Sequence, residues 1–152
     1  MASTSALDLW ETLAAAAAAE SPLWGEALRT DPEHEPIFSP LAAELYALGL
    51  ETIYEGYLLH YGQPRLFAPP DADTALLLGD YLYAHGLVHI AATGSVEAVA
   101  ELAELISTCA ALRAEGRPGD GEAWAAAASR LGGGPDVAAV ERALAAHALR
   151  VG

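Results

Sequence analysis

The sequence contains no lysine. Its cationic side chains are seven arginines, set against 21 acidic residues, and the formal net charge is −14 over 152 residues. Without lysine the chain cannot form a Schiff base, a Walker-type phosphate loop or a lysine general base. The negative charge repels nucleic acid and anionic lipid, and no cluster of arginines offsets it. We therefore expect no nucleic-acid partner.

Cysteine and long apolar runs are also scarce. The single cysteine, Cys109, cannot form an internal disulfide, which fits a reducing compartment. The N-terminus lacks the basic residues that precede the apolar core of a signal peptide. Polar residues break the longest apolar run before it reaches the ~18 residues of a membrane span. We expect a cytoplasmic chain with no membrane-spanning segment.

Alanine, in contrast, is abundant. It occupies 35 positions, and it is a strong helix former and a poor strand former. Capping residues predict helix starts near Ser3 to Ser5, Ser21, Ser39, Asp71 or Asp73, and Ser95, with two more helices at about 121–131 and 136–150. Prolines and glycines predict helix ends near Ala19, Arg29, Tyr61, Ala92 and Glu115.

These elements predict one all-α helical bundle over residues 1–152, because the length suits a single domain and no segment reads as a strand. Residues 1–38 are expected to form peripheral N-terminal helices and a loop. Residues 39–152 are expected to form the main bundle.

Two neighbouring helices differ in the distribution of their apolar residues. In the helix at 96–112, an apolar arc that includes Leu102 and Ile106 lies opposite acidic residues, which is typical of a helix with one solvated face. The helix at 72–92 carries apolar residues on every side. Such a helix is either central in its domain or covered by a second chain.

Three short motifs follow one another at intervals that match those of the motifs in a known family. Glu51-Thr-Ile-Tyr-Glu55 is followed by His60-Tyr-Gly-Gln-Pro64 and then by Gly79-Asp80 within LLLGDYLYA. This order resembles the D-D-x-x-D, R-R-G-x-P and G-D motifs of the trans-polyprenyl diphosphate synthases, without a gap. SRLGG at 129–133 resembles the family's C-R-L-G helix end. The resemblance covers about residues 40–133 and implies the first half of the isoprenoid synthase fold.

The departures from the family pattern concern the residues that carry its chemistry. Family aspartates hold magnesium, and family arginines grip the diphosphate. No residue at the matching positions is a permanent cation; those positions hold Glu51, Thr52, Glu55, His60 and Tyr61. The resemblance leaves Glu51 and Glu55, four apart on one helix face, as candidate magnesium ligands. The family's lysine-threonine pair aligns with Asp120-Gly121, which would repel a diphosphate.

Other polar residues have a structural interpretation beside a functional one. His85 and His89 have the spacing of a helical zinc pair, but without a third ligand nearby a hydrogen-bonded contact is favoured. Asp80 lies in an apolar helix and needs a polar partner. Aromatic residues at helical spacing favour a core or interface over a ligand tunnel; they are Tyr54, Tyr57, Tyr61, Tyr81 and Tyr83.

The resemblance and its departures favour a non-catalytic accessory or regulatory subunit of a heteromeric trans-polyprenyl diphosphate synthase, without a cofactor of its own. The alternative is a shortened, Mg-dependent prenyl synthase or terpene-related enzyme that uses Glu51 and Glu55 and is completed in a homodimer. In the family, the helix matching 72–92 and the next one form the dimer contact. The predicted interface therefore comprises Leu78, Asp80, Tyr81, Leu82, His85, His89, Leu102 and Ile106.

Overall fold

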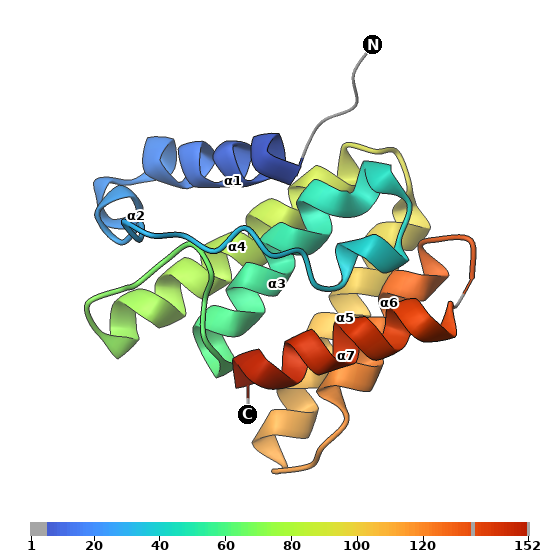
Figure 1. Cartoon of the computed structure of the whole chain (residues 1–152). Coiled ribbons are helices and arrows are strands. Elements are labelled where there is room, and N and C mark those ends of the chain that lie inside the picture. The colour runs from blue at the N-terminus through green and yellow to red at the C-terminus, as the bar shows by residue number, and fades with distance from the viewer. Residues whose placement is uncertain (1–5, 135, 152) are drawn as a thin grey trace.

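The computed structural model describes residues 6–134 and 136–151, and it is built of helices joined by loops (Figure 1). The helices are α1 (Ala6–Glu20), α2 (Pro22–Glu26), α3 (Ala47–Tyr61), α4 (Ala72–Ala91), α5 (Val96–Ala114), α6 (Asp120–Arg130) and α7 (Val137–Val151), with 3-10 turns η1 (Ser39–Leu41) and η2 (Glu44–Tyr46). Within the described ranges there is no β-strand, and one isolated bridge joins Leu28 to Phe67. The predicted all-α class is confirmed.

Over the residues that the structure describes, every helix is too short or too polar to cross a membrane.

Side-chain caps begin three helices as the sequence predicts. At the starts of α2, α4 and α5, the side chains of Ser21, Asp71 and Ser95 each accept a hydrogen bond from a backbone N–H of the first turn, at 2.8–3.1 Å. Gly94, with φ +88°, separates α4 from α5 in the left-handed conformation that favours glycine. The cap expected near Ser3 to Ser5 lies outside the described residues.

The short helix α2 ends earlier than the sequence predicts. It was expected to reach Arg29 but stops at Glu26. The next residues leave the helix because their backbone bonds to a distant loop: Arg29 N donates to Leu66 O at 2.8 Å, and Ala68 N donates to Ala27 O at 2.7 Å. Tertiary hydrogen bonds thus replace the last helical turn.

The long helix expected from Ser39 is also corrected. Ser39 begins a 3-10 turn rather than capping an α-helix, and its backbone N–H donates to Glu51 Oε2 at 3.2 Å. Ala42 then adopts an extended conformation (φ −107°, ψ 168°), which interrupts the helical path. The α-helix therefore begins only at Ala47.

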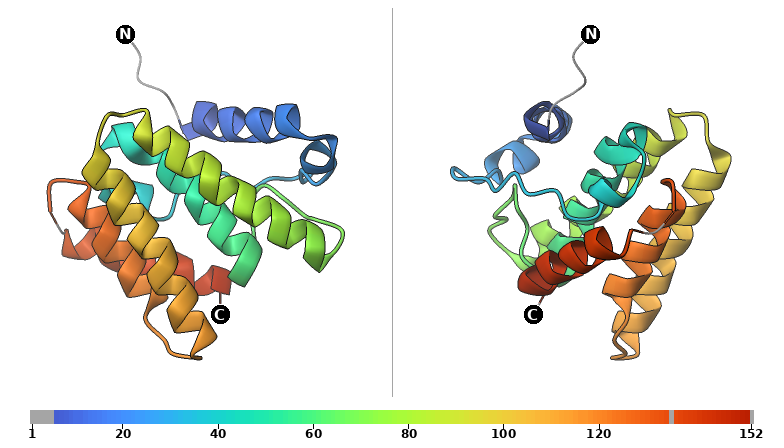
Figure 2. Two further views of the ribbon diagram at one scale, coloured as in Figure 1. Left: turned by 180° about the vertical axis from the view of Figure 1, so that it is seen from behind. Right: turned by 45° about the vertical axis from the view of Figure 1, so that its right-hand side comes forward.

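Helix α3 is the centre of the fold. All its residues from Gly49 to Leu59 are buried. In Figures 1 and 2, α4 runs antiparallel beside α3, α1 and α2 lie on one side of this pair, and α5, α6 and α7 lie on the other. Helix α4, whose apolar residues surround its axis, packs against α3 and leaves one face exposed.

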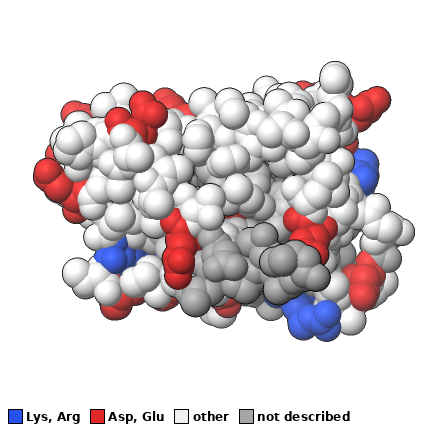
Figure 3. Space-filling model, turned by 90° about the horizontal axis from the view of Figure 1, so that it is seen from above, with Lys and Arg blue, Asp and Glu red and all other residues white. Residues whose placement is uncertain are grey.

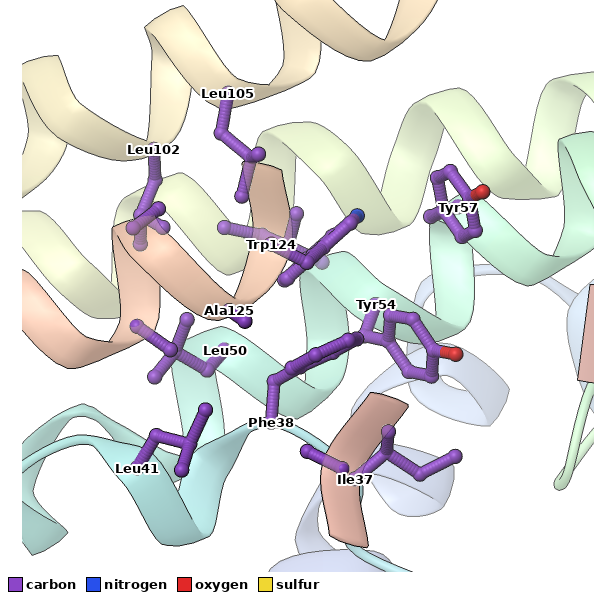
Figure 4. Close-up of a cluster of buried hydrophobic side chains, with 14 of the residues drawn as sticks. Ile37, Phe38, Leu41, Leu50, Tyr54, Tyr57, Leu102, Leu105, Trp124 and Ala125 are labelled. Carbon is purple, nitrogen blue, oxygen red and sulfur yellow. The ribbon is translucent and has the colours of Figure 1, made fainter. Parts of the chain in front are cut away.

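Two apolar clusters flank α3. The larger cluster joins α3 to η1, α5, α6 and α7, and the rings of Phe38, Tyr54 and Trp124 meet within it at centroid distances of 5.0–5.5 Å (Figure 4). The smaller cluster joins α1 and α2 to α3 and α4, and includes Trp10 and Leu78. The peripheral helices of residues 1–38 therefore share a core with the central pair.

Four glycines allow α3 and α4 to approach closely, and we call them the glycine seam. They are spaced seven apart on each helix, so that Gly49 faces Gly86 and Gly56 faces Gly79. A Cβ atom on Gly56 would lie 2.9 Å from the carbonyl oxygen of Gly79, and one on Gly79 would lie 3.2 Å from the carbonyl oxygen of Gly56. Any side chain here would push the two backbones apart.

Replacing Gly56 by alanine should destabilise the protein by about 1–3 kcal/mol, because the new methyl group overpacks the seam and this outweighs the better helix propensity of alanine. Gly25→Ala is the matched control, since its Cβ would meet only Ala18 at an ordinary 3.5 Å. Urea unfolding followed by circular dichroism measures both variants. Equal stability of the two would contradict the close approach of α3 and α4.

Candidate functional site

Glu51 and Glu55 lie one turn apart on α3 and are completely buried. Arg65, in the loop that follows α3, is also completely buried and folds back over them. Its Nη1 lies 2.6 Å from Glu51 Oε1, and its Nε lies 3.0 Å from Glu55 Oε1. One arginine thus binds both carboxylates of the predicted motif, and we call these three residues the Arg65 cluster.

Backbone N–H groups complete the coordination of the two carboxylates. Glu51 Oε2 accepts hydrogen bonds from the N–H groups of Ile37 and Ser39, at 3.1 and 3.2 Å. Glu55 Oε2 accepts from the N–H groups of Arg65 and Leu66, at 2.9 and 2.8 Å. All four carboxylate oxygens therefore have a donor from the chain itself.

The guanidinium of Arg65 is held on its other sides as well. It donates to the carbonyl oxygens of Glu35 at 2.7 Å and Glu51 at 3.2 Å. The rings of Trp10 and Tyr54 lie over it, at 4.7 and 5.0 Å from the guanidinium carbon. Burial alone would lower the pKa of Arg65, but the two carboxylates outweigh it and raise that pKa above its usual value.

The magnesium implied by the family resemblance does not fit this arrangement. A magnesium ion needs open carboxylate oxygens and room for several water ligands. Here Glu51 and Glu55 are fully buried and their oxygens are already occupied by donors. No group of three or more His, Cys, Asp or Glu residues in the described ranges could hold a metal ion. The pair therefore serves in an internal ion cluster.

The other members of the motif have separate contacts. Thr52 Oγ1 donates to the carbonyl oxygen of Leu48 at 2.7 Å, a local helical bond. His60 Nε2 lies 3.1 Å from Asp80 Oδ1, in an orientation that does not make a hydrogen bond. Tyr61 lies under the guanidinium of Arg113, 5.2 Å from the ring centre. The five motif residues do not converge on one site.

A second polar cluster lies where α3, α5 and α6 meet. Asp120 binds Arg113, whose Nη2 lies 2.7 Å from Asp120 Oδ2, and both contact the hydroxyl of Tyr57. Burial would raise the pKa of Asp120, but the bonds from Tyr57 and Arg113 lower it overall. Asp120 therefore neutralises Arg113, which leaves the pair without charge to attract a diphosphate.

His147 of α7 lies in the core beside Tyr54. Its Nδ1 lies 2.7 Å from the hydroxyl of Tyr54, and its ring also contacts Phe38. Burial lowers the pKa of His147, an effect that Asp120 opposes only in part. The folded protein thus favours the neutral form of this histidine.

An apolar pocket of about 450 Å³ lies between α6 and α7. Ala125 and Ala126 on α6 face Val140 and Leu144 on α7 across it. Arg130, which also lines it, is bound to Glu101 at 2.5 Å. The pocket could hold an apolar group, but it brings together no set of residues that suggests a reaction.

The predicted interface residues divide into two groups. Leu78, Leu82 and Leu102 are at most 1% exposed and belong to the two apolar clusters of the chain itself. The remainder lie at or near the surface: Asp80 is exposed, and Tyr81, His85, His89 and Ile106 are half-buried.

His85 and His89 lie side by side on α4. Their rings meet edge to face at 4.5 Å, and the ring of His85 stacks on Tyr81 at 5.2 Å. Burial lowers the pKa of His89, with a smaller effect from His85.

Arg65 is the residue of the site that sequence reasoning missed. The signal for it was present: Glu51 and Glu55 stand in a helix with no polar face, and such carboxylates require a buried partner. Arg65 is the first cation after them along the chain, and it stands between Pro64 and the apolar Leu66 and Phe67.

Comparison with known proteins adds no relative. The chain matches no family model, no curated protein and no solved structure.

Replacing Arg65 by methionine should destabilise the protein by about 3–5 kcal/mol, because two buried carboxylates lose their cation. Arg117→Met is the control: Arg117 pairs with Glu115 at the surface, and that exposed pair is worth no more than ~1 kcal/mol. Adding Glu51→Gln and Glu55→Gln to Arg65→Met should recover part of the loss. Chemical unfolding measures all of these, and an Arg65→Met variant as stable as the control would contradict the buried cluster.

The unfolding free energy should fall as the pH is lowered from 7 toward 5. The lowered pKa of His147 means that the unfolded state, with a pKa near 6.5, takes up its proton first. The contribution of His147 to the unfolding free energy is therefore fully present above pH 6.5. Below that pH the unfolding free energy falls by at most about 1.4 kcal/mol per pH unit, the limit for a single titrating group.

His147→Gln should flatten this slope, whereas His34→Gln, in an exposed loop, should keep it. Urea unfolding at several pH values measures the slope. A slope that persists unchanged in His147→Gln would contradict the burial of a neutral histidine.

Proposed function

We propose that this chain is a non-catalytic subunit of a trans-polyprenyl diphosphate synthase assembly, which pairs with a catalytic subunit through helix α4. The observation that carries the proposal is the closure of the Glu51 and Glu55 motif by Arg65. At the positions where the family resemblance places magnesium ligands, the chain has a buried ion cluster. Catalysis through this motif would require both carboxylates to leave Arg65.

The distribution of the arginines supports the same proposal. Binding and releasing a diphosphate requires cations around it, since charge develops on the leaving group. Six of the seven arginines lie within 4.0 Å of a carboxylate in the described residues: Arg29, Arg65, Arg113, Arg117, Arg130 and Arg150. Little cationic charge is left for a diphosphate.

The exposed side of α4 supports a role in pairing. Leu77 and Val88 are 57% and 61% exposed, and Ala84 between them is also exposed. These three residues share one side of the helix, which we call the α4 face. Leu76 lies at its edge, and Val96 at the start of α5 is 78% exposed. Exposed apolar residues along one side of a helix favour a protein contact there.

The purified chain should form no prenyl diphosphate product from isopentenyl diphosphate, an allylic diphosphate and magnesium. Co-expressed with a full-length trans-polyprenyl diphosphate synthase from the same genome, it should elute as a complex by size exclusion with light scattering. Val88→Asp should abolish the complex, because it places a charge in the contact. Leu149→Asp, on the 84% exposed Leu149 of α7, should leave it intact.

Two results would contradict the proposal. One is turnover by the chain alone that is lost in Glu51→Ala or Glu55→Ala. The other is a chain that forms no complex with any such synthase under these conditions.

A further inference from the structure

Asp80 is the charged residue that lies between Leu77 and Ala84 along the α4 face, and Asp73 lies one turn before Leu77. Asp80 lies three residues after Leu77 and four before Ala84, so it shares their side of the helix. Its side chain is 63% exposed. From Tyr81 to Val96 the sequence contains no acidic or basic residue other than two histidines. A partner that covers Leu77 and Ala84 must therefore also cover the carboxylate of Asp80.

Covering Asp80 is unfavourable unless the partner supplies a donor. A carboxylate removed from water without a hydrogen bond or a cation loses its solvation with no compensation. His60 approaches it on the α3 side, but the orientation is not that of a hydrogen bond. The side chain of Asp80 is therefore open to solvent, and a partner that covered it would have to supply the donor.

A second copy of this chain is poorly suited to supply that donor. Each copy carries a net charge of −14. In an antiparallel pairing of two α4 helices about Ala84, Val88 of the second copy would lie opposite Asp80 and could offer it nothing. Apart from Arg142 on α7, the arginines are already paired with carboxylates in the described residues.

One face of the whole molecule also has little positive charge. Seen from above, that face is largely uncharged, with more acidic than basic side chains on it (Figure 3). A partner with basic residues around an apolar contact would complement such a surface, and a second acidic chain would not.

We propose that the α4 face binds an amphipathic helix of a different protein, whose apolar side covers Leu77, Ala84 and Val88 and whose arginine or lysine pairs with Asp80. The inference rests on the proposed function, since it describes the partner of that pairing. Asp80 then has two effects on binding. It strengthens the binding of a cationic partner, and it weakens the pairing of two copies of this chain.

Two synthetic helical peptides provide the test. Both carry the same leucine and alanine contact side, one flanked by arginines and the other by glutamates. Binding to the full chain is measured by fluorescence anisotropy at low and at higher salt. The arginine peptide should bind at least tenfold more tightly at low salt, and the preference should shrink as salt rises.

Variants of the chain test whether Asp80 causes the tighter binding of the arginine peptide. Asp80→Asn should remove most of it, and Glu141→Gln, which makes the same change of charge on the exposed surface of α7, should not. Asp80→Leu should convert a chain that is monomeric by light scattering into one that self-associates. Val88→Asp should weaken the binding of both peptides.

Three outcomes would overturn the inference: equal binding of the two peptides, no binding of either, or a wild-type homodimer disrupted by Val88→Asp. These are distinct from failure of the proposed function. A complex with the synthase that forms equally well with Asp80→Arg would overturn the inference alone. A chain that forms no complex with the synthase would overturn the proposed function.

Discussion

The buried contact between one arginine and two glutamates is the interaction on which the arrangement of this chain depends. Arg65 brings the loop after α3 back onto α3, reaches the carbonyl of Glu35 in the loop before η1, and lies against Trp10 of α1. An ion cluster hidden from water is tolerated only when each partner is in place. We interpret the Arg65 cluster as selecting one arrangement of these segments rather than as a source of net stability.

Local signals explain which parts of the fold could be predicted from the sequence. Ser21, Asp71 and Ser95 begin helices because each cap bonds to backbone only two or three residues away. Ser39 carries the same signal, yet its N–H bonds to Glu51 instead. That competing bond joins residues distant in sequence, so capping rules cannot detect it.

The sequence also could not show which side of α4 faces the core and which side is exposed. A helix that is apolar all round does not indicate which side its neighbour covers, and adjacent positions differ by about 100° around the axis. Leu78 is therefore in the core, whereas Leu77 beside it is exposed. The spacing of Gly79 and Gly86 held the missing information, because glycines seven apart mark the side on which another helix approaches. Their match to Gly49 and Gly56 also fixes the pairing of the two helices.

Tyr54 connects the two ends of the chain. One side of its ring meets the Arg65 guanidinium, which also contacts Trp10 of the first helix, and its hydroxyl meets His147 of the last helix. The last helix thus contacts Tyr54 directly, and the first helix reaches it through Arg65. Detaching either terminal helix would expose to water the side chains around Tyr54 on which the contacts of the other terminal helix depend. The chain should consequently behave as one cooperative unit, in which neither terminal helix can open without weakening its counterpart.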